Sequence, residues 1–359
     1  PDAHQKRWGI KKGGAAGYRW NEFEERFDAN KHPNEANRFG WVVEIDPMDP
    51  TSTPIKRTAL GRAAHEGAAV ALTDSGRAVV YMGEDSRFEY IYKFVSRDAV
   101  KPGGLKANRE LLDHGTLYVA RFDVDGTGEW LPLTQGQGPL TTDKGFANQG
   151  DVLIKARQAS DLLGATKMDR PEWTAVDPVS KEVYCTLTNN TNRGGNNHPA
   201  VDAANPRTNN TMGHIIRWKE KGGQAGTSFE WDVYLFGARE DGKQSENLSA
   251  LTADQDFSSP DGLAFSKSSG ICWIQTDDGA YTDVSNCMML AAVPGSVGDG
   301  GKKTLSYTKA DGSKLDIVTP VGKAATADTL KRFLVGPKGC EITGLAETPD
   351  GKAIFVNIQ

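Results

Sequence analysis

The chain of 359 residues has 42 lysine and arginine residues against 47 aspartate and glutamate residues, giving a net charge of −5. This balance argues against a nucleic-acid binder, which usually carries a basic excess. No apolar stretch approaches the roughly 20 residues needed to span a bilayer. The 40 glycines and 17 prolines lie mostly at turns between short apolar segments, a pattern typical of all-β proteins.

The first part of the chain predicts little regular structure. Residues 1–37 are polar and glycine-rich, so we expect a loop with at most a short helix near residues 20–27. Residues 38–46 predict a strand closed by Pro47, and a second strand begins at residue 56. Neither an initiator methionine nor a signal-peptide core is visible at the start, and the last residues resemble an interrupted strand. We therefore expect a single domain over residues 1–359 that is incomplete at both ends.

A unit of two short strands recurs four times, and each copy begins with an acidic residue. An apolar strand follows the acid, then a turn, then a second apolar strand. Repeats of this kind indicate a propeller, which can reach this length as one domain. The first strands are predicted at residues 66–72, 172–176, 261–265 and 341–345, and the second strands at 78–82, 183–187, 271–274 and 353–356.

Further elements complete the pattern. Alternating or apolar segments predict strands at residues 88–94, 115–122, 214–218 and 231–236, so that a unit has four strands, as a propeller blade does. Residues 151–163 have apolar positions at helical spacing with Asp151 as N-cap, and residues 324–333 predict a second helix. Residues 189–210 are expected to form an extended loop, and residues 295–303 a glycine-rich surface loop. The predicted fold is an all-β propeller with a few inserted short helices.

The acids at the strand starts are the main functional signal. Because the innermost strands of a propeller line its axis, Glu66, Glu172, Asp261 and Glu341 should face one another. Two carboxylates about 5 Å apart repel by roughly 3 kcal/mol at an effective dielectric of 20, so protons or cations must compensate them. Oxygen ligands favour hard ions such as calcium, and iron(III) also suits them.

A second polar set follows the second strands of these units. Antiparallel strands bring the end of one strand beside the start of its neighbour, so these residues could lie at the same mouth as the four acids. The alternative is that all the acids cap turns and remain solvated. The second set consists of Asp85, Asn189, Asn190, Asp277 and Asp278.

Arg170 lies two residues before Glu172, with Pro171 fixing the backbone between them. A guanidinium binds phosphate oxygens in pairs, so Arg170 is a candidate anion clamp. The alternative is a salt bridge to Asp169 or Glu172. His65 could support the neighbouring Glu66, or it could be purely structural.

Other chemistries are not indicated. The chain has no nucleophile elbow around a serine and no phosphate-binding loop of the Walker type. Its four cysteines form no CxxC pair. Cys185 and Cys272 fall in predicted strands, where buried free thiols are expected.

Six segments of the chain resemble the PhoX family of bacterial alkaline phosphatases. They occur in the same order and cover nearly the whole sequence. The sequence between residues 81 and 94 reads YMGEDSRFEYIYKF, and residues 169–173 read DRPEW. The matching segments are residues 37–46, 64–67, 81–94, 169–173, 259–265 and 339–344.

The resemblance implies a six-bladed propeller with calcium and iron ions in its channel, hydrolysis of phosphate monoesters, and twin-arginine export to the periplasm or beyond. We also expect a monomer. An iron-bridging cysteine and an asparagine on the phosphate would lie upstream of residue 1. Arg170 matches the arginine that holds the phosphate, and with Glu172 it is the expected catalytic pair. The matching metal-binding acids are Glu66, Asp85, Glu172, Asp261 and Glu341.

The resulting hypothesis is phosphoryl transfer to water, assisted by cations on these acids and by Arg170. Two other classes stay open. Residues 259–265 also resemble calcium-dependent lactonase propellers, which act on lactones or esters. The third class is a propeller without catalysis that serves as an extracellular binding module.

Overall fold

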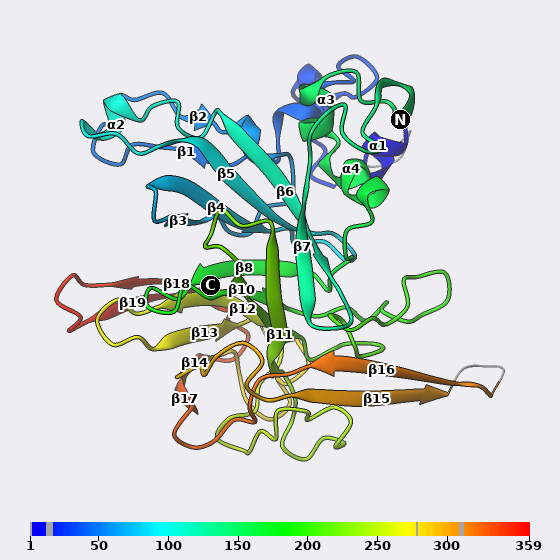
Figure 1. Ribbon diagram of the computed structural model, residues 1–359, viewed down its shortest axis with the longest axis vertical. Helices are drawn as coiled ribbons and strands as arrows, with labels where there is room; N and C mark the ends of the chain where they lie inside the picture. Colours follow the sequence, from blue (N-terminus) through cyan, green and yellow to red (C-terminus); the bar gives the residue numbers. More distant parts are fainter. Residues whose placement is uncertain (1, 12–16, 278, 309–311) are drawn as a thin grey trace.

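The computed structural model describes residues 2–11, 17–277, 279–308 and 312–359. Antiparallel strands dominate, and the helices are short (Figure 1), which confirms the predicted all-β class. Among the described residues, no helix has the length and apolar character needed to cross a membrane. The helices are α1 (Ala3–Arg7), α2 (Gly104–Ala107), α3 (Gln149–Ile154) and α4 (Ala156–Leu163), with 3-10 turns at Trp20–Glu22, Glu25–Phe27, Glu35–Arg38, Thr58–Leu60 and Thr142–Lys144.

The largest sheet has nine strands in the spatial order β3-β4-β5-β6-β7-β11-β10-β9-β8. It contains two blade-like units, one from β3 to β7 and one from β8 to β11. The units join where β7 pairs with β11, for example Glu129 with Ser228. The strands are β3 (Ala69–Leu72), β4 (Arg77–Gly83), β5 (Ile91–Ala99), β6 (Gly115–Phe122), β7 (Thr127–Pro132), β8 (Pro171–Val176), β9 (Val183–Leu187), β10 (His214–Glu220) and β11 (Ser228–Phe236).

A third unit of four strands and three hairpins complete the described residues. The third unit has the order β12-β13-β14-β17, and the hairpin of β15 and β16 is inserted between β14 and β17. All four predicted two-strand units are confirmed, as β3–β4, β8–β9, β12–β13 and β18–β19. The strands outside the large sheet are β1 (Val43–Glu44), β2 (Ile55–Lys56), β12 (Pro260–Phe265), β13 (Cys272–Thr276), β14 (Met288–Ala292), β15 (Lys302–Thr308), β16 (Lys314–Pro320), β17 (Leu330–Val335), β18 (Ile342–Glu347) and β19 (Ile354–Ile358).

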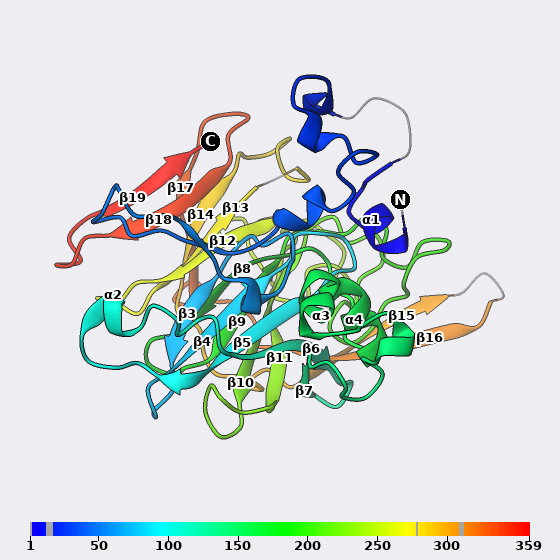
Figure 2. The ribbon, with the colours of Figure 1, turned by 90° about the horizontal axis from the view of Figure 1, so that it is seen from above.

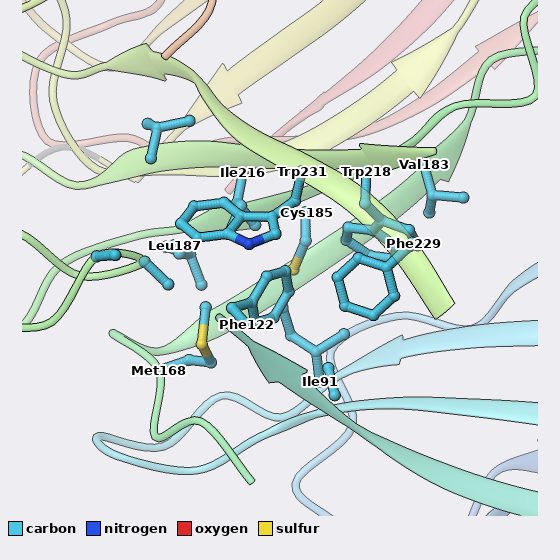
Figure 3. Close-up of a cluster of buried hydrophobic side chains, with 14 of the residues drawn as sticks. Ile91, Phe122, Met168, Val183, Cys185, Leu187, Ile216, Trp218, Phe229 and Trp231 are labelled. Carbon is cyan, nitrogen blue, oxygen red and sulfur yellow. The ribbon is translucent and has the colours of Figure 1, made fainter. Parts of the chain in front are cut away.

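The main core lies between the two units of the large sheet (Figure 3). The ring of Phe122 packs edge-on against Trp218, Phe229 and Trp231, with centroids 5.2 to 6.3 Å apart. Burying each such side chain contributes about 1.5–3 kcal/mol. Every residue of β9 is buried, including the polar Thr186, so this strand does not alternate between buried and exposed positions. Cys185 and Cys272 are buried free thiols, as predicted.

The predicted strand at residues 38–46 is wrong over most of its length. Only Val43 and Glu44 pair, with Ile55 and Lys56 of β2. Upstream, the chain forms a 3-10 turn, and its backbone bonds elsewhere: the carbonyl of Phe39 accepts from Arg62 and that of Gly40 accepts from Ala63. Side chains and loops satisfy these backbone groups, so they do not need a sheet.

The predicted helix at residues 324–333 is also wrong. A turn closes between Thr326 and Leu330, and the chain then forms β17. The free edge of β14 pairs with this segment, and Phe333 packs edge-on against Trp273 at 4.8 Å. Tertiary pairing therefore overrides the weak local preference for helix.

The helical prediction for residues 151–163 is correct in kind but wrong in detail. Two helices, α3 and α4, meet at a break at Lys155. The N-cap is Asn148, whose side chain accepts from the backbone of Asp151, so Asp151 is not the cap. Likewise the strand predicted from residue 88 begins at Ile91, because Phe88 has a left-handed backbone with φ 69°.

Candidate cation and phosphate site

The first strands of the units lie side by side. In both views β8 lies between β3 and β12 (Figures 1 and 2), and β12 also contacts β18. A cavity of about 460 Å³ runs between β3, β8 and β12, and Glu66 is one of its lining residues. Of the four acids at the strand starts, Glu66 lines this cavity, whereas Glu172, Asp261 and Glu341 do not.

Three carboxylates come together at this region. The oxygens of Glu66, Asp85 and Glu172 lie within 4.8 Å of one another. Glu66 precedes β3, Asp85 follows β4, and Glu172 belongs to β8. Gly83 permits this approach, since a Cβ there would lie 2.1 Å from the carbonyl oxygen of Glu172. Only glycine lets the end of β4 pack so closely on β8.

Irregular pairing displaces the acids from the regular ladder. The register of β8 against β9 shifts between Pro171 and Thr174, around Glu172. The register of β12 against β13 shifts between Pro260 and Leu263, around Asp261. Bulges of this kind redirect side chains and are common beside functional sites.

One hydroxyl links the two bulged segments. Thr186 Oγ1 accepts from the backbone N–H of Trp173 and donates to the carbonyl of Asp261, at 3.1 and 2.6 Å. The residues beside the two acids are therefore fixed relative to each other. A sequence pattern gives no sign of this role for Thr186.

Asp261 and Glu341 belong to the same electrostatic group. Burial first, and then the charges of Glu341 and Glu66, raise the pKa of Asp261 to about 8. Burial also raises the pKa of Glu341, with a further contribution from Asp277. Burial and neighbouring acids thus raise the pKa values of Glu66, Glu172, Asp261 and Glu341. Asp278 lies outside the described residues.

Glu172 is the most perturbed acid of the group. Burial first, and then the charges of Asp261, Asp85 and Glu66, raise its pKa to about 10. Its Oε1 atom is buried without a hydrogen-bond partner, and the nearest cationic atom is Arg170 Nη2 at 3.4 Å. A buried carboxylate in this state calls for a cation or a proton.

Arg170 lies at the edge of the cluster. Its Nε and Nη2 donate to the two oxygens of Asp85, at 2.7 and 3.1 Å, and Nη1 donates to Asn189 at 3.3 Å. Its backbone is left-handed, with φ 56°, which is costly for a residue other than glycine. The main ion pair is thus with Asp85, not with Asp169 as one alternative held, while Glu172 lies close enough for a weaker pairing.

Asp169 has a different environment from the site acids. It is fully buried, and its carboxylate accepts from Asn190 at 2.9 Å, Arg193 at 2.8 Å and Asn210 at 3.0 Å. Asn190 is therefore part of this pocket and does not lie with the site, whereas its neighbour Asn189 does. The predicted long loop between residues 189 and 210 is confirmed, and Asp169 holds its two ends together.

His65 is structural in its contacts. Its Nε2 donates to the carbonyl of Gly61 at 3.0 Å, and burial lowers the pKa of its imidazole.

Sequence reasoning missed Glu84, a fully buried acid directly before Asp85. The only signal was the acidic pair itself, which resembles an ordinary turn.

The fold and site together define a propeller-like β-protein with a carboxylate cluster beside an arginine. The chain belongs to the alkaline phosphatase PhoX family, whose model matches residues 2–359. This confirms the family resemblance drawn from the sequence.

The full chain is similar to the solved structure of Pseudomonas fluorescens PhoX in complex with vanadate, a transition state analogue. The identity is 45% and the TM-score is 0.85, with 100% of this chain covered. The chain spans 59% of the length of that protein. The comparison with curated proteins found no match.

Proposed function

We propose that the protein hydrolyses phosphate monoesters with the help of cations bound by its acid cluster. The observation that carries the proposal is the position of Arg170 beside Glu66, Asp85 and Glu172, with Glu172 Oε1 buried and without a hydrogen bond. Membership of the alkaline phosphatase family supports it, as does the vanadate complex of the similar Pseudomonas protein. No observation favours the lactonase or the non-catalytic alternative.

The donor set fits the proposed ions. Carboxylate oxygens are the ligands that calcium prefers, and iron(III) accepts them as well. The cations, when bound, would polarise the phosphate and lower the pKa of a water molecule. We assign their ligands to Glu66, Asp85, Glu172, Asp261 and Glu341.

Arg170 has donors to spare for a phosphate. A guanidinium has five N–H groups, and Asp85 and Asn189 engage three of them. Of the two that remain, one is on Nη1 and one is on Nη2, which also lies 3.4 Å from Glu172 Oε1; both would be available to equatorial phosphate oxygens. Asp85 and the restrained backbone of Arg170 fix the direction of the guanidinium, so little ordering is needed when substrate binds.

We also propose a periplasmic or extracellular location and a monomeric state. The location rests on the family resemblance alone. Fractionation of the producing cells and light scattering of the purified protein test these two statements.

The first test is Glu172→Ala in the purified protein. Cation content, by elemental analysis for calcium and iron, and hydrolysis of p-nitrophenyl phosphate should be lost together. Glu230→Ala is the control, since Glu230 is exposed and, among the residues that the structure describes, its side chain forms an ion pair with Lys221 alone. A Glu172→Ala protein that keeps both its metals and its activity would overturn the assignment.

The second test is Arg170→Ala. We expect a higher KM and a lower kcat with the metals retained, because the residue would touch phosphate and not the ions. Loss of the metals would instead make Arg170 structural. Faster turnover of a lactone than of a phosphate monoester by the wild type would contradict the proposed reaction class.

A further inference from the structure

A buried ion pair involves Glu84, the residue directly before Asp85 of the acid cluster. Glu84 and Arg157 meet at 2.6 Å, with side chains 0% and 5% exposed. Glu84 Oε1 also accepts from the backbone N–H of Ala64 at 3.1 Å, and its Oε2 accepts from the hydroxyl of Tyr92 at 3.2 Å. Its carboxylate is thus fully engaged, and none of these partners belongs to the site described above.

This carboxylate connects the two segments that carry Glu66 and Asp85. Ala64 lies two residues before Glu66, and Glu84 lies directly before Asp85. The two segments run antiparallel, with Asp85 N–H donating to the carbonyl of Ala64 at 2.9 Å and Glu66 N–H to that of Gly83 at 3.3 Å. Glu84 thus holds both segments from the side opposite the cluster.

Arg157 extends the connection to the helices. It belongs to α4, and its Nη2 donates to Ser86 Oγ at 3.3 Å, directly after Asp85. Its Nη1 donates to the carbonyl of Arg7 at the end of α1, at 2.9 Å, and its guanidinium lies 3.9 Å from the ring of Trp8. Figure 1 shows α1 beside α4. Arg157 therefore contacts the residues on both sides of Asp85, Glu84 and Ser86, and is itself held by the Arg7–Trp8 segment.

Such support matters because the clustered acids repel one another. The carboxylates of Glu66 and Asp85 lie within 4.8 Å of each other, and each would move apart if its segment were free to shift. A cation site needs its oxygens at a set spacing before the ion binds. The spacing must be held by the backbone, and the backbone here is held by Glu84 and Arg157.

We propose that Glu84 and Arg157 are positioning residues that set the spacing of Glu66 and Asp85 for cation binding. The inference rests on the proposed function, since it concerns the same cations. Partners behind metal ligands typically change metal affinity or activity by about 10–100-fold when they are replaced.

The test is Glu84→Gln in the metal-loaded protein, titrated with the chelator EGTA while calcium retention is measured by elemental analysis. Glutamine keeps an acceptor for Ala64 but no charge for Arg157, whose remaining acid is Glu89 at 3.7 Å. Calcium should be lost at about tenfold lower chelator concentration. Saturating calcium chloride should then restore kcat, which a general loss of folding would not allow.

The matched control is Asp232→Asn. Asp232 forms an equally buried pair with Arg217, at 2.7 Å, and accepts from the backbone N–H of Gly298 at 2.6 Å. Arg217 also donates to the carbonyl of Ser296 and to Asp299, so this pair supports the loop at residues 296–299 and not the cluster. It should lower the melting temperature without changing calcium retention. Wild-type retention in Glu84→Gln, together with a similar fall in melting temperature, would overturn the proposal.

If Glu84→Gln does not fold, Arg157→Lys takes its place. Lysine keeps the charge but cannot reach Glu84, Ser86 and the Arg7 carbonyl together, so an intermediate chelator concentration is expected. If this variant retained calcium as well as the wild type does, that result would also overturn the proposal. Failure of the proposed function is a separate outcome, in which the wild type itself holds no calcium or hydrolyses no phosphate ester.

Discussion

Asp169 and Glu172 are buried acids three residues apart, yet their surroundings are opposite. Asp169 accepts hydrogen bonds from Asn190, Arg193 and Asn210. Glu172 Oε1 has no hydrogen bond, only an ion-pair contact with Arg170 at 3.4 Å, and the charges of other acids act on the carboxyl group. Burial alone therefore does not separate a structural acid from a binding one. The distinction is whether the protein itself satisfies the carboxylate or leaves it for a ligand.

The same contrast applies to the neighbouring asparagines. Asn190 donates to Asp169 and pairs through its backbone with Asn210, so it closes the loop. Asn189 instead accepts from Arg170. Two adjacent residues thus contribute to different environments, Asn190 to the hydrogen bonds around Asp169 and Asn189 to the candidate site. The effects of removing an acid from either environment should therefore be measurable separately.

The largest expected effect is a loss of stability when the structural acid Asp169 is removed. Asp169→Ala leaves Arg193 buried without its main partner and removes the acceptor of two asparagines. Breaking a buried pair in this way costs about 3–5 kcal/mol. Urea unfolding should show this loss in the free energy of unfolding. A loss below about 1 kcal/mol would mean that the pocket is not structural.

A pH effect of about 3 kcal/mol should come from the same pocket. His214 accepts at Nδ1 from Asn210 and donates from Nε2 to the carbonyl of Ala204, so the folded state holds the neutral imidazole. Burial, with the nearby positive charges of Arg207 and Arg193, lowers its pKa to about 4 although Asp169 opposes the shift.

The direction of this effect follows from linkage. The unfolded histidine takes up a proton near pH 6.5, and the folded one only near pH 4. Its contribution is therefore complete above pH 6.5 and is lost as the pH falls from 6.5 to 4, at about 1.4 kcal/mol per pH unit. The free energy of unfolding of the wild type, measured in urea, should fall more steeply with decreasing pH over this range than that of His214→Gln. Parallel pH profiles would contradict the assignment.

The smallest effect on stability is expected at Glu172, in the candidate binding site. In the presence of EGTA, Glu172→Gln should change the free energy of unfolding by about 1 kcal/mol or less, because its Oε1 loses no hydrogen bond and a repulsive carboxyl group is removed. The same variant should fail to retain calcium. A loss as large as that of Asp169→Ala would remove the distinction between the two acids.

Several elements were predictable because they depend on local pattern. The four two-strand units follow from short apolar segments between turn residues, and the strand at Gly115–Phe122 matches its prediction. The helix at residues 324–333 and the strand at 38–46 failed because distant partners decide those segments: the edge of β14 in one case, and Arg62 and Ala63 in the other.

The sequence by itself determined the family, the all-β class and the acids at the strand starts, because these depend on residue types and their spacing along the chain. Only the tertiary structure decided which polar residues are satisfied. Asp169 receives Arg193 and Asn210 from a distant loop, and Glu84 receives Arg157 from α4. Glu172 receives no such partner at Oε1. Hydrogen bonding and repulsion act across a few ångströms of space, which no separation along the sequence records.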